Sequence, residues 1–312
     1  MFTRIIVPLD CSRFSEHALP VAASMAEATR GGLDLVHVHV PVKLPKYDGA
    51  MGQRARESLR EQEDELRDRE LAYLNELGAR LRSTRPRLTV TTRVLEGAVA
   101  PVLLREARPP EAQLIVTTTH GRGPMGRAVL GGTTDVLVRN AAIPVLVVRG
   151  TRSEPDLSET FRPDRILLPL DGTERAERAV SCAVACARPF RGKLILLRVV
   201  GRGSSEESTA RDYLDEVAKR IAVGGVEVDT MVEESRGRAE GILSATARAE
   251  ADLVVLATRG QGYLARLVMG SVAERLVRRG PTPVLVCRSP KQSALARLAG
   301  ASDAGTVVPA PG

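Results

Sequence analysis

Short apolar runs alternate along this chain with segments whose apolar residues recur at helical spacing. The runs are rich in Val, Ile and Leu, as expected of strands in a parallel sheet that is covered on both faces. The segments between them repeat apolar residues at i, i+3, i+4 and i+7, which predicts amphipathic helices. The pattern therefore predicts an α/β fold. The expected strands lie near residues 4–9, 33–40, 88–95, 113–118 and 144–148, and again near residues 165–170, 193–200, 226–232, 252–257 and 283–287.

The whole pattern occurs twice. Arg4–Asp10 (RIIVPLD) recurs as Arg165–Asp171 (RILLPLD) at an offset of 161 residues, whereas Leu114–Gly121 matches Leu253–Gly260 at an offset of 139. The first copy therefore carries 161 − 139 = 22 extra residues. They fall in a highly charged segment, residues 53–82, which we predict to be one helix.

Two copies of this length predict two domains, each with an open parallel sheet of five strands flanked by helices. We place domain 1 at residues 1–149 and domain 2 at residues 164–289. Residues 150–163 are expected to form a linker, and residues 290–312, rich in Ala, Gly, Ser and Pro, a flexible tail.

The first helix of each copy supports the alignment. Its buried stripe in the first copy is predicted as Ala18, Val21, Ala22, Met25 and Ala26, which become Ala179, Cys182, Ala183, Cys186 and Ala187 in the second. Because two cysteines take core positions and Cys287 aligns with Val148 in the last strand, packing explains them better than redox chemistry does. In the inserted helix the predicted stripe is Leu59, Leu66, Tyr73, Leu77 and Leu81.

Composition narrows the classes of function. The net charge is +7, but acidic and basic residues are interleaved, and four Tyr, four Phe and no Trp offer little for base stacking, so we expect no nucleic-acid partner. No apolar run is long enough to span a membrane and MFTRIIVPLD does not resemble a secretory signal, so a cytoplasmic protein with reduced cysteines is expected. His37 and His39 share one strand face without an evident third ligand, and no metal site is predicted.

Each copy places a glycine loop between its fourth strand and its last helix. The second reads Ala257-Thr-Arg-Gly260, nine residues, then Gly270-Ser271; the first reads Thr118-Thr-His-Gly121, nine residues, then Gly131-Gly132-Thr133. Ligands of parallel sheets bind at the carboxyl ends of the strands, and a helix that begins there directs free N–H groups at an anion. The loops therefore predict phosphate sites.

A structural role is the alternative for the same polar residues. Ser271 with Glu274 three residues later also fits a capping box, and Asp10 and Asp171 fit helix caps or turns. The neighbouring glycine loop favours phosphate binding for Ser271, with Arg259 and Arg266 as candidate countercharges.

These repeated loops resemble the universal stress protein family, whose ATP-binding members carry G-x-x-G, nine residues, then G-[S/T] in this place. The resemblance covers both domains. It implies a Rossmann-like, three-layer fold of the adenine nucleotide alpha hydrolase type. It also implies a role in a stress response and a bound ATP or related adenine nucleotide, with Mg²⁺ as a candidate companion. The implied nucleotide-binding residues are Asp171, Val199, Ala257, Gly260, Gly270, Ser271 and Val272 in the second domain and Asp10, Val38, Thr118, Gly121, Gly131, Gly132 and Thr133 in the first.

The chain departs from this pattern in both copies. The first glycine is Thr118 in one copy and Ala257 in the other, and the Ser/Thr position of the first copy is Gly132, with Thr133 displaced by one residue. Only the second copy keeps the hydroxyl in register, so its site is the stronger candidate.

Other functions remain open at this stage. The G-x-G-x-x-G at residues 121–126 follows the fourth strand rather than the first, which argues against a dinucleotide site. We identify no catalytic residue, so an enzyme would be at most a slow ATPase or phosphotransferase. The third candidate is an interaction module, in which Val145–Val148 and Val284–Cys287 pair edge to edge and make the copies an intramolecular pseudo-dimer; a homodimer is a further candidate.

Overall fold

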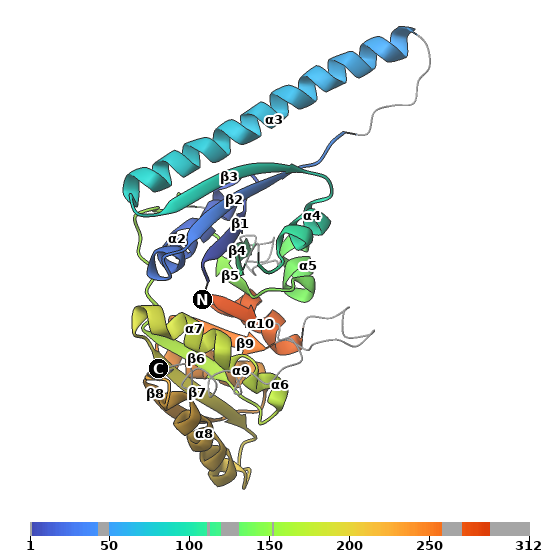
Figure 1. The fold of residues 1–312 in the computed structure, drawn as a ribbon. Coiled ribbons are helices and arrows are strands. Elements are labelled where there is room, and N and C mark those ends of the chain that lie inside the picture. Colours follow the sequence, from blue (N-terminus) through green and yellow to red (C-terminus); the bar gives the residue numbers. More distant parts are fainter. Residues whose placement is uncertain are drawn as a thin grey trace, which may run out of the picture. The chain divides into compact units, whose positions relative to one another are not determined.

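The chain forms two compact units, each built around its own parallel sheet (Figure 1). Unit 1 comprises Met1–Phe161 and Val277–Pro281, and unit 2 comprises Arg162–Leu276 and Thr282–Gly312. The computed structural model describes residues 2–42, 50–110, 113–119, 131–151, 153–257 and 270–287. The predicted α/β class, with two tandem five-stranded parallel sheets flanked by helices, is confirmed.

In unit 1 the strands lie in the order β3-β2-β1-β4-β5, and the neighbouring strands are parallel. Its elements are β1 (Arg4–Pro8), α1 (Arg13–Glu16), α2 (Ala18–Ala28), β2 (Gly32–His39), α3 (Ala50–Thr84), β3 (Thr89–Glu96), α4 (Val99–Glu106), β4 (Leu114–Thr119), α5 (Gly132–Asn140) and β5 (Val145–Arg149).

Unit 2 repeats this topology, with the order β10-β9-β6-β7-β8 and parallel pairing. Its elements are β6 (Arg165–Pro169), α6 (Glu174–Glu177), α7 (Val180–Phe190), β7 (Lys193–Val200), α8 (Glu207–Ala222), β8 (Val228–Glu234), α9 (Arg238–Arg248), β9 (Leu253–Ala257), α10 (Ser271–Arg279) and β10 (Val284–Cys287).

Right-handed crossovers produce three layers in each unit. In unit 1 the chain steps from β1 through β2 to β3 on one side, and then returns to β4 and β5 on the other. The helices of these two halves consequently cover opposite faces, with α4 beside α5 on one face and α2 on the other (Figure 1). The middle strands are buried on both faces, which explains why they read as continuous apolar runs.

The predicted helix stripe is buried in unit 1, where Ala18, Val21, Ala22, Met25 and Ala26 are all core residues. In unit 2 the prediction is wrong at one position. Cys186 and Cys287 are buried, but Cys182 is only partly buried, because α7 leaves that edge of its stripe near the surface. None of the four cysteines, all of which the structure describes, forms a disulfide.

Helix α3 is the inserted element, and only its second half belongs to the core. Leu77 and Leu81 are buried, as predicted, together with Leu74. The predicted stripe fails at Leu66, which is 44 % exposed. The reason is geometric: the 35-residue helix packs along β3 near its end, and its first half runs beyond the sheet (Figure 1).

The predicted linker, residues 150–163, contacts unit 1 closely. The buried Arg85 donates to the carbonyl oxygens of Leu157 (3.2 Å) and Glu159 (2.6 Å) and pairs with Glu27. The predicted tail lies outside the described residues. Within the part of the chain that is described, no helix combines the length and apolar composition that crossing a membrane requires.

Candidate functional site

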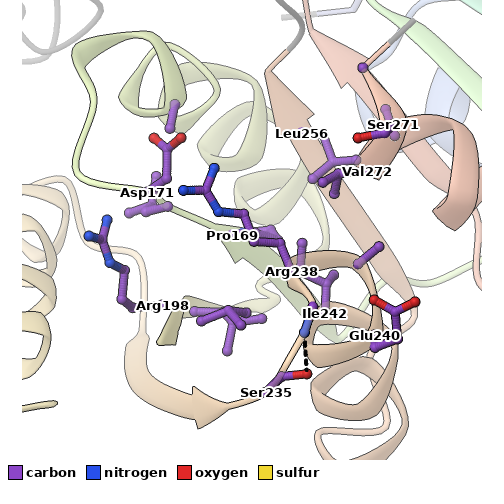
Figure 2. A pocket seen from close by; sticks show the side chains of 18 of the residues that line it. Pro169, Asp171, Arg198, Ser235, Arg238, Glu240, Ile242, Leu256, Ser271 and Val272 are labelled. Carbon is purple, nitrogen blue, oxygen red and sulfur yellow. Dashed lines mark hydrogen bonds between the residues drawn. The ribbon is translucent and has the colours of Figure 1, made fainter. Parts of the chain in front are cut away.

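A cavity of about 670 Å³ opens in unit 2 beyond the carboxyl ends of its strands (Figure 2). Its walls come from the turn after β6, the end of β7, the turn between β8 and α9, the end of β9 and the start of α10. Because β7 and β9 flank β6 on opposite sides, the connections reverse direction here. Open α/β sheets bind ligands at such a point, and the volume falls within the range of roughly 300–1,000 Å³ of small-molecule sites.

The residues predicted for the second site come together at this cavity. It is lined by Asp171, Val199, Ala257, Gly270, Ser271 and Val272. Gly260 lies outside the described residues, as do Arg259 and Arg266, the predicted countercharges. The fold thus gathers residues from the ends of three strands and the start of one helix; their contact with a nucleotide stays a prediction.

Asp171 lies in the turn after β6 and lines the cavity (Figure 2). One of its oxygens, Oδ1, accepts hydrogen bonds from the backbone N–H of Thr173 (3.2 Å) and from the Thr173 hydroxyl. Burial acts to raise the pKa of Asp171, but these bonds and the charges of Arg175 and Arg238 outweigh it and hold the pKa below its usual value. Asp171 therefore stabilises the turn, as the structural alternative predicted, and it still presents an ionised carboxylate at the cavity wall.

Helix α10 begins at the cavity with Ser271 as its first residue. The first intrahelical hydrogen bond runs from the N–H of Glu274 to the carbonyl of Gly270 (3.0 Å), so Gly270 occupies the N-cap position and Ser271 lies in the first turn. The alternative of Ser271 as the N-cap is therefore wrong. The first N–H groups of a helix have no intrahelical acceptor, and an anion at this end satisfies them.

Sequence reasoning missed the strongest electrostatic feature of the cavity, a set of arginines drawn from four separate segments. They are Arg175, Arg198, Arg236, Arg238 and Arg275, against three carboxylates, Asp171, Glu206 and Glu240. Glu240 already forms an ion pair with Arg275. Their position in the sequence could have pointed to them, because several of these arginines follow or end predicted strands. Parallel sheets bind their ligands at the ends of strands.

Arg198, near the end of β7, shows a buried polar atom in need of a partner. Its guanidinium lies over the Tyr213 ring, 5.9 Å from the centroid, and its Nη1 is buried without a hydrogen-bond partner among the described residues. Buried donors are normally satisfied, which makes this nitrogen a candidate donor to a bound anion.

The residues predicted for the first site lie at the corresponding places of unit 1. Asp10 follows β1, and its Oδ1 accepts from the N–H (3.1 Å) and hydroxyl of Ser12, as Asp171 does from Thr173. Val38 is buried in β2, and the Thr118 carbonyl accepts from Thr134. Gly131, Gly132 and Thr133 start helix α5, with Gly131 at its N-cap. Gly121 lies outside the described residues.

In unit 1, side chains at the end of the second strand contact the inserted helix α3. The Glu70 carboxylate of α3 lies 3.2 Å from His37 Nε2 and 3.0 Å from His39 Nδ1. His37 Nδ1 lies 2.8 Å from the Leu9 carbonyl and 3.7 Å from the Cys11 sulfur. The sequence showed no third polar side chain beside the two histidines, and in the structure Glu70 lies in that position. Even so, no group of three or more such side chains has metal-binding geometry within the described ranges.

Comparison with known proteins decides the family. The model of the universal stress protein family matches the chain twice, over residues 1–149 and 163–288. The chain belongs to the universal stress protein family. Two tandem matches also account for the repeat in the sequence.

Similar universal stress proteins share the tandem length. One from Mycolicibacterium smegmatis is 30% identical over 299 residues, covering 91% of this chain and 96% of that protein. Another, from Mycobacterium tuberculosis, is 27% identical over 304 residues with the same coverage of each chain. The crystal structure of a universal stress protein from Archaeoglobus fulgidus has the same fold, with a TM-score of 0.68 at 19% identity, covering 92% of this chain and 99% of that one.

The two universal stress protein domains of this chain differ at the site. At the offsets of 161 and 139, none of the five cavity arginines of unit 2 has an arginine or lysine as its counterpart in unit 1. The counterparts of Arg175, Arg198, Arg236, Arg238 and Arg275 are Phe14, His37, Gly97, Val99 and Val136. This set of five arginines is therefore a feature of the second domain.

Proposed function

We propose that unit 2 binds ATP or a related adenine nucleotide in its cavity, as part of a stress response. The observation that carries the proposal is the meeting of the predicted residues, the open start of α10 and five arginines around one cavity of about 670 Å³. The apolar side chains of Val199, Ile242 and Leu256 also line it and offer a surface for a base. A cavity that is apolar in part and cationic in part matches the two halves of a nucleotide.

Each end of the nucleotide has a complementary group. We assign the phosphates to the start of α10 at Gly270 and Ser271, because free N–H groups and glycine backbone admit a close anion. We assign the adenine to the side of Asp171 and Val199, where an ionised carboxylate accepts a hydrogen bond from the exocyclic amino group. Mg²⁺ would accompany the phosphates. No residue is assigned to hydrolysis.

Isothermal titration of the full chain with ATP tests the proposal. The expected result is one ATP per chain, because none of the five cavity arginines of unit 2 has an arginine or lysine counterpart in unit 1. Gly270→Val should abolish binding without unfolding the protein: among the described residues no atom lies within 4 Å of a Cβ built at Gly270, so the new side chain would occupy the space assigned to phosphate.

Gly132→Val is the matched control, since Gly132 also starts a helix and a Cβ there likewise has no atom within 4 Å in the part of the chain that the structure describes. It should leave the ATP affinity unchanged. No binding of ATP, ADP or AMP to the wild-type chain would refute the proposal, and a loss of binding in the Gly132 variant would move the site to unit 1. Phosphate release in the same samples, abolished by Asp171→Asn, would favour the slow ATPase instead.

A further inference from the structure

A second hollow adjoins the cavity of unit 2. It has a volume of about 450 Å³ and shares Ser235, Arg236, Gly237 and Glu240 with the larger one, while Arg202 lines its far side. The turn between β8 and α9 therefore separates two open spaces. We call residues 235–238 the β8–α9 turn.

The β8–α9 turn carries a net positive charge toward both spaces. Arg236 and Arg238 are exposed, and both line the larger cavity. The carboxylate shared by both hollows, Glu240, pairs with Arg275, and its side chain also lies against Gly237 of the turn. Two guanidinium groups beside one carboxylate leave the turn with a net positive charge.

The start of helix α9 also lies on the cavity wall. Gly237 is extended at the N-cap position (φ −138°, ψ 137°), and its N–H donates to the Ser235 hydroxyl (3.3 Å). The N-cap residue of α9 makes no side-chain capping hydrogen bond, and the first residues of the helix, Arg238 and Ala239, line the cavity. The first turn of α9 and two guanidinium groups thus line the same space.

The corresponding turn of unit 1 is shorter and uncharged. Its β3 ends at Glu96 and α4 begins at Val99, so two residues connect them, whereas three residues connect Glu234 to Arg238 in unit 2. The connection in unit 1 contains no arginine, since it consists of Gly97 and Ala98. The longer, basic turn is a specific feature of the cavity that faces it.

We propose that the β8–α9 turn is a second anion subsite, which holds the outer phosphates of a nucleotide whose first phosphate lies at α10. This rests on the proposed function of the cavity. Arg236 and Arg238 act as specificity-determining residues: they distinguish a triphosphate from a monophosphate, while Asp171, Val199 and the start of α10 hold the base and the first phosphate. A guanidinium binds a phosphate through paired, charge-assisted hydrogen bonds.

Titration of the full chain with AMP, ADP and ATP, for wild type and for the double variant Arg236→Gln/Arg238→Gln, tests the subsite. In wild type the affinity should rise with each added phosphate. In the double variant the ATP affinity should fall about ten- to a hundredfold, as expected for lost charge-assisted hydrogen bonds, while the AMP affinity stays within about twofold. Both side chains are exposed, so the fold should survive, and circular dichroism checks that it does.

Arg175→Gln is the matched control, because Arg175 is another exposed arginine of the same cavity wall, outside the turn. It should weaken the three nucleotides alike. An unchanged ratio of ATP to AMP affinity in the double variant would overturn the subsite and leave the proposed function standing. An equal loss of that ratio in Arg175→Gln would also overturn it, because general cavity charge would then explain the preference.

Inorganic tripolyphosphate separates the subsite from the nucleotide function. If the wild-type chain binds no adenine nucleotide, the proposed function fails. Tripolyphosphate binding that disappears in Arg236→Gln/Arg238→Gln would then still support an anion subsite on the turn. Absence of both kinds of binding would overturn both.

Discussion

The second strand of each unit ends beside a different set of neighbours. In unit 1, His37 contacts Glu70 and the Leu9 carbonyl; at an offset of 161 its counterpart in unit 2 is Arg198, whose Nη1 has no partner among the described residues. The neighbours changed with it. A Cβ on Gly172 would lie 2.9 Å from Arg198 Nη1, so the cysteine that unit 1 carries at the same offset would crowd the arginine.

The same fold surrounds the end of its second strand in two different ways. Unit 1 satisfies the polar groups at the end of its second strand with its own inserted helix through Glu70. Unit 2 keeps a shorter helix of 16 residues there and leaves arginines facing an open cavity. Polar groups at the end of the second strand are therefore paired internally in one copy and left facing a cavity in the other.

The largest expected effect tests whether the second half of α3 packs into the core of unit 1 as α8 packs into the core of unit 2. Leu77 is 2 % exposed, and Val217 of α8, its counterpart at an offset of 140, is fully buried. Leu77→Ala should lower the free energy of unfolding of unit 1 by about 2–5 kcal/mol, because it leaves a core cavity. Hydrogen–deuterium exchange, read on peptides of each unit, measures this loss.

Leu66→Ala is the control on the same helix. With Leu66 at 44 % exposure, the change should stay within about 0.5 kcal/mol. A cost comparable to that of Leu77→Ala would mean that the first half of α3 is covered, and the contrast between the two halves would be lost.

The next effect concerns Cys11, which replaces the glycine of unit 2. Burial first, and then the carboxylates of Glu70, Asp10 and Glu16, raise its pKa from 9.0 to about 11. The thiolate is the reactive form, so Cys11 in the folded protein should react with iodoacetamide at pH 8 about a hundredfold more slowly than in urea. Mass spectrometry of the labelled peptides gives both rates.

His37 provides the competing outcome for that experiment. Its Nδ1 lies 3.7 Å from the Cys11 sulfur, and a protonated imidazole there would stabilise the thiolate. Labelling faster than in urea would show that His37 outweighs the three carboxylates. The Glu70→Gln variant should speed the labelling, since it removes the first of these charges.

The sequence predicted the sheets well because their signal is local. Buried parallel strands read as apolar runs, and every strand ends within two residues of its predicted bound. Leu66 was misplaced because the stripe gives the face of a helix and cannot show where the sheet beneath it ends.

The candidate site was predictable only where the repeat and the resemblance reached it. Asp171, Gly270 and Ser271 were found from the repeated strand end and the glycine loop, and all three line the cavity. Arg238 and Glu70 were missed because each acts through the tertiary fold. The pairing of His39 with Glu70, 31 residues away, depends on how α3 crosses β2, and no local pattern contains that information.

The smallest expected effect concerns a tyrosine–glutamate hydrogen bond that occurs in both units. Tyr73 OH donates to Glu16 Oε1 (2.9 Å) in unit 1, and Tyr213 OH donates to Glu177 Oε1 (3.0 Å) in unit 2. Removing either hydroxyl by substitution with Phe should cost about 1–3 kcal/mol, because the acceptor is a charged, partly buried carboxylate. Exchange protection of α1 and of α6 measures the two losses separately.

The two losses should differ in a fixed order. Glu177 also accepts from Arg220 (3.1 Å), so its charge keeps a partner when Tyr213 is changed to Phe. Glu16 is buried, and Tyr73 supplies its hydrogen bond from α3, so Tyr73→Phe leaves the carboxylate with a larger desolvation cost. We therefore expect the larger loss in unit 1. The reverse order would mean that Arg220 contributes little, and that α8 depends on its tyrosine more than the inserted helix does.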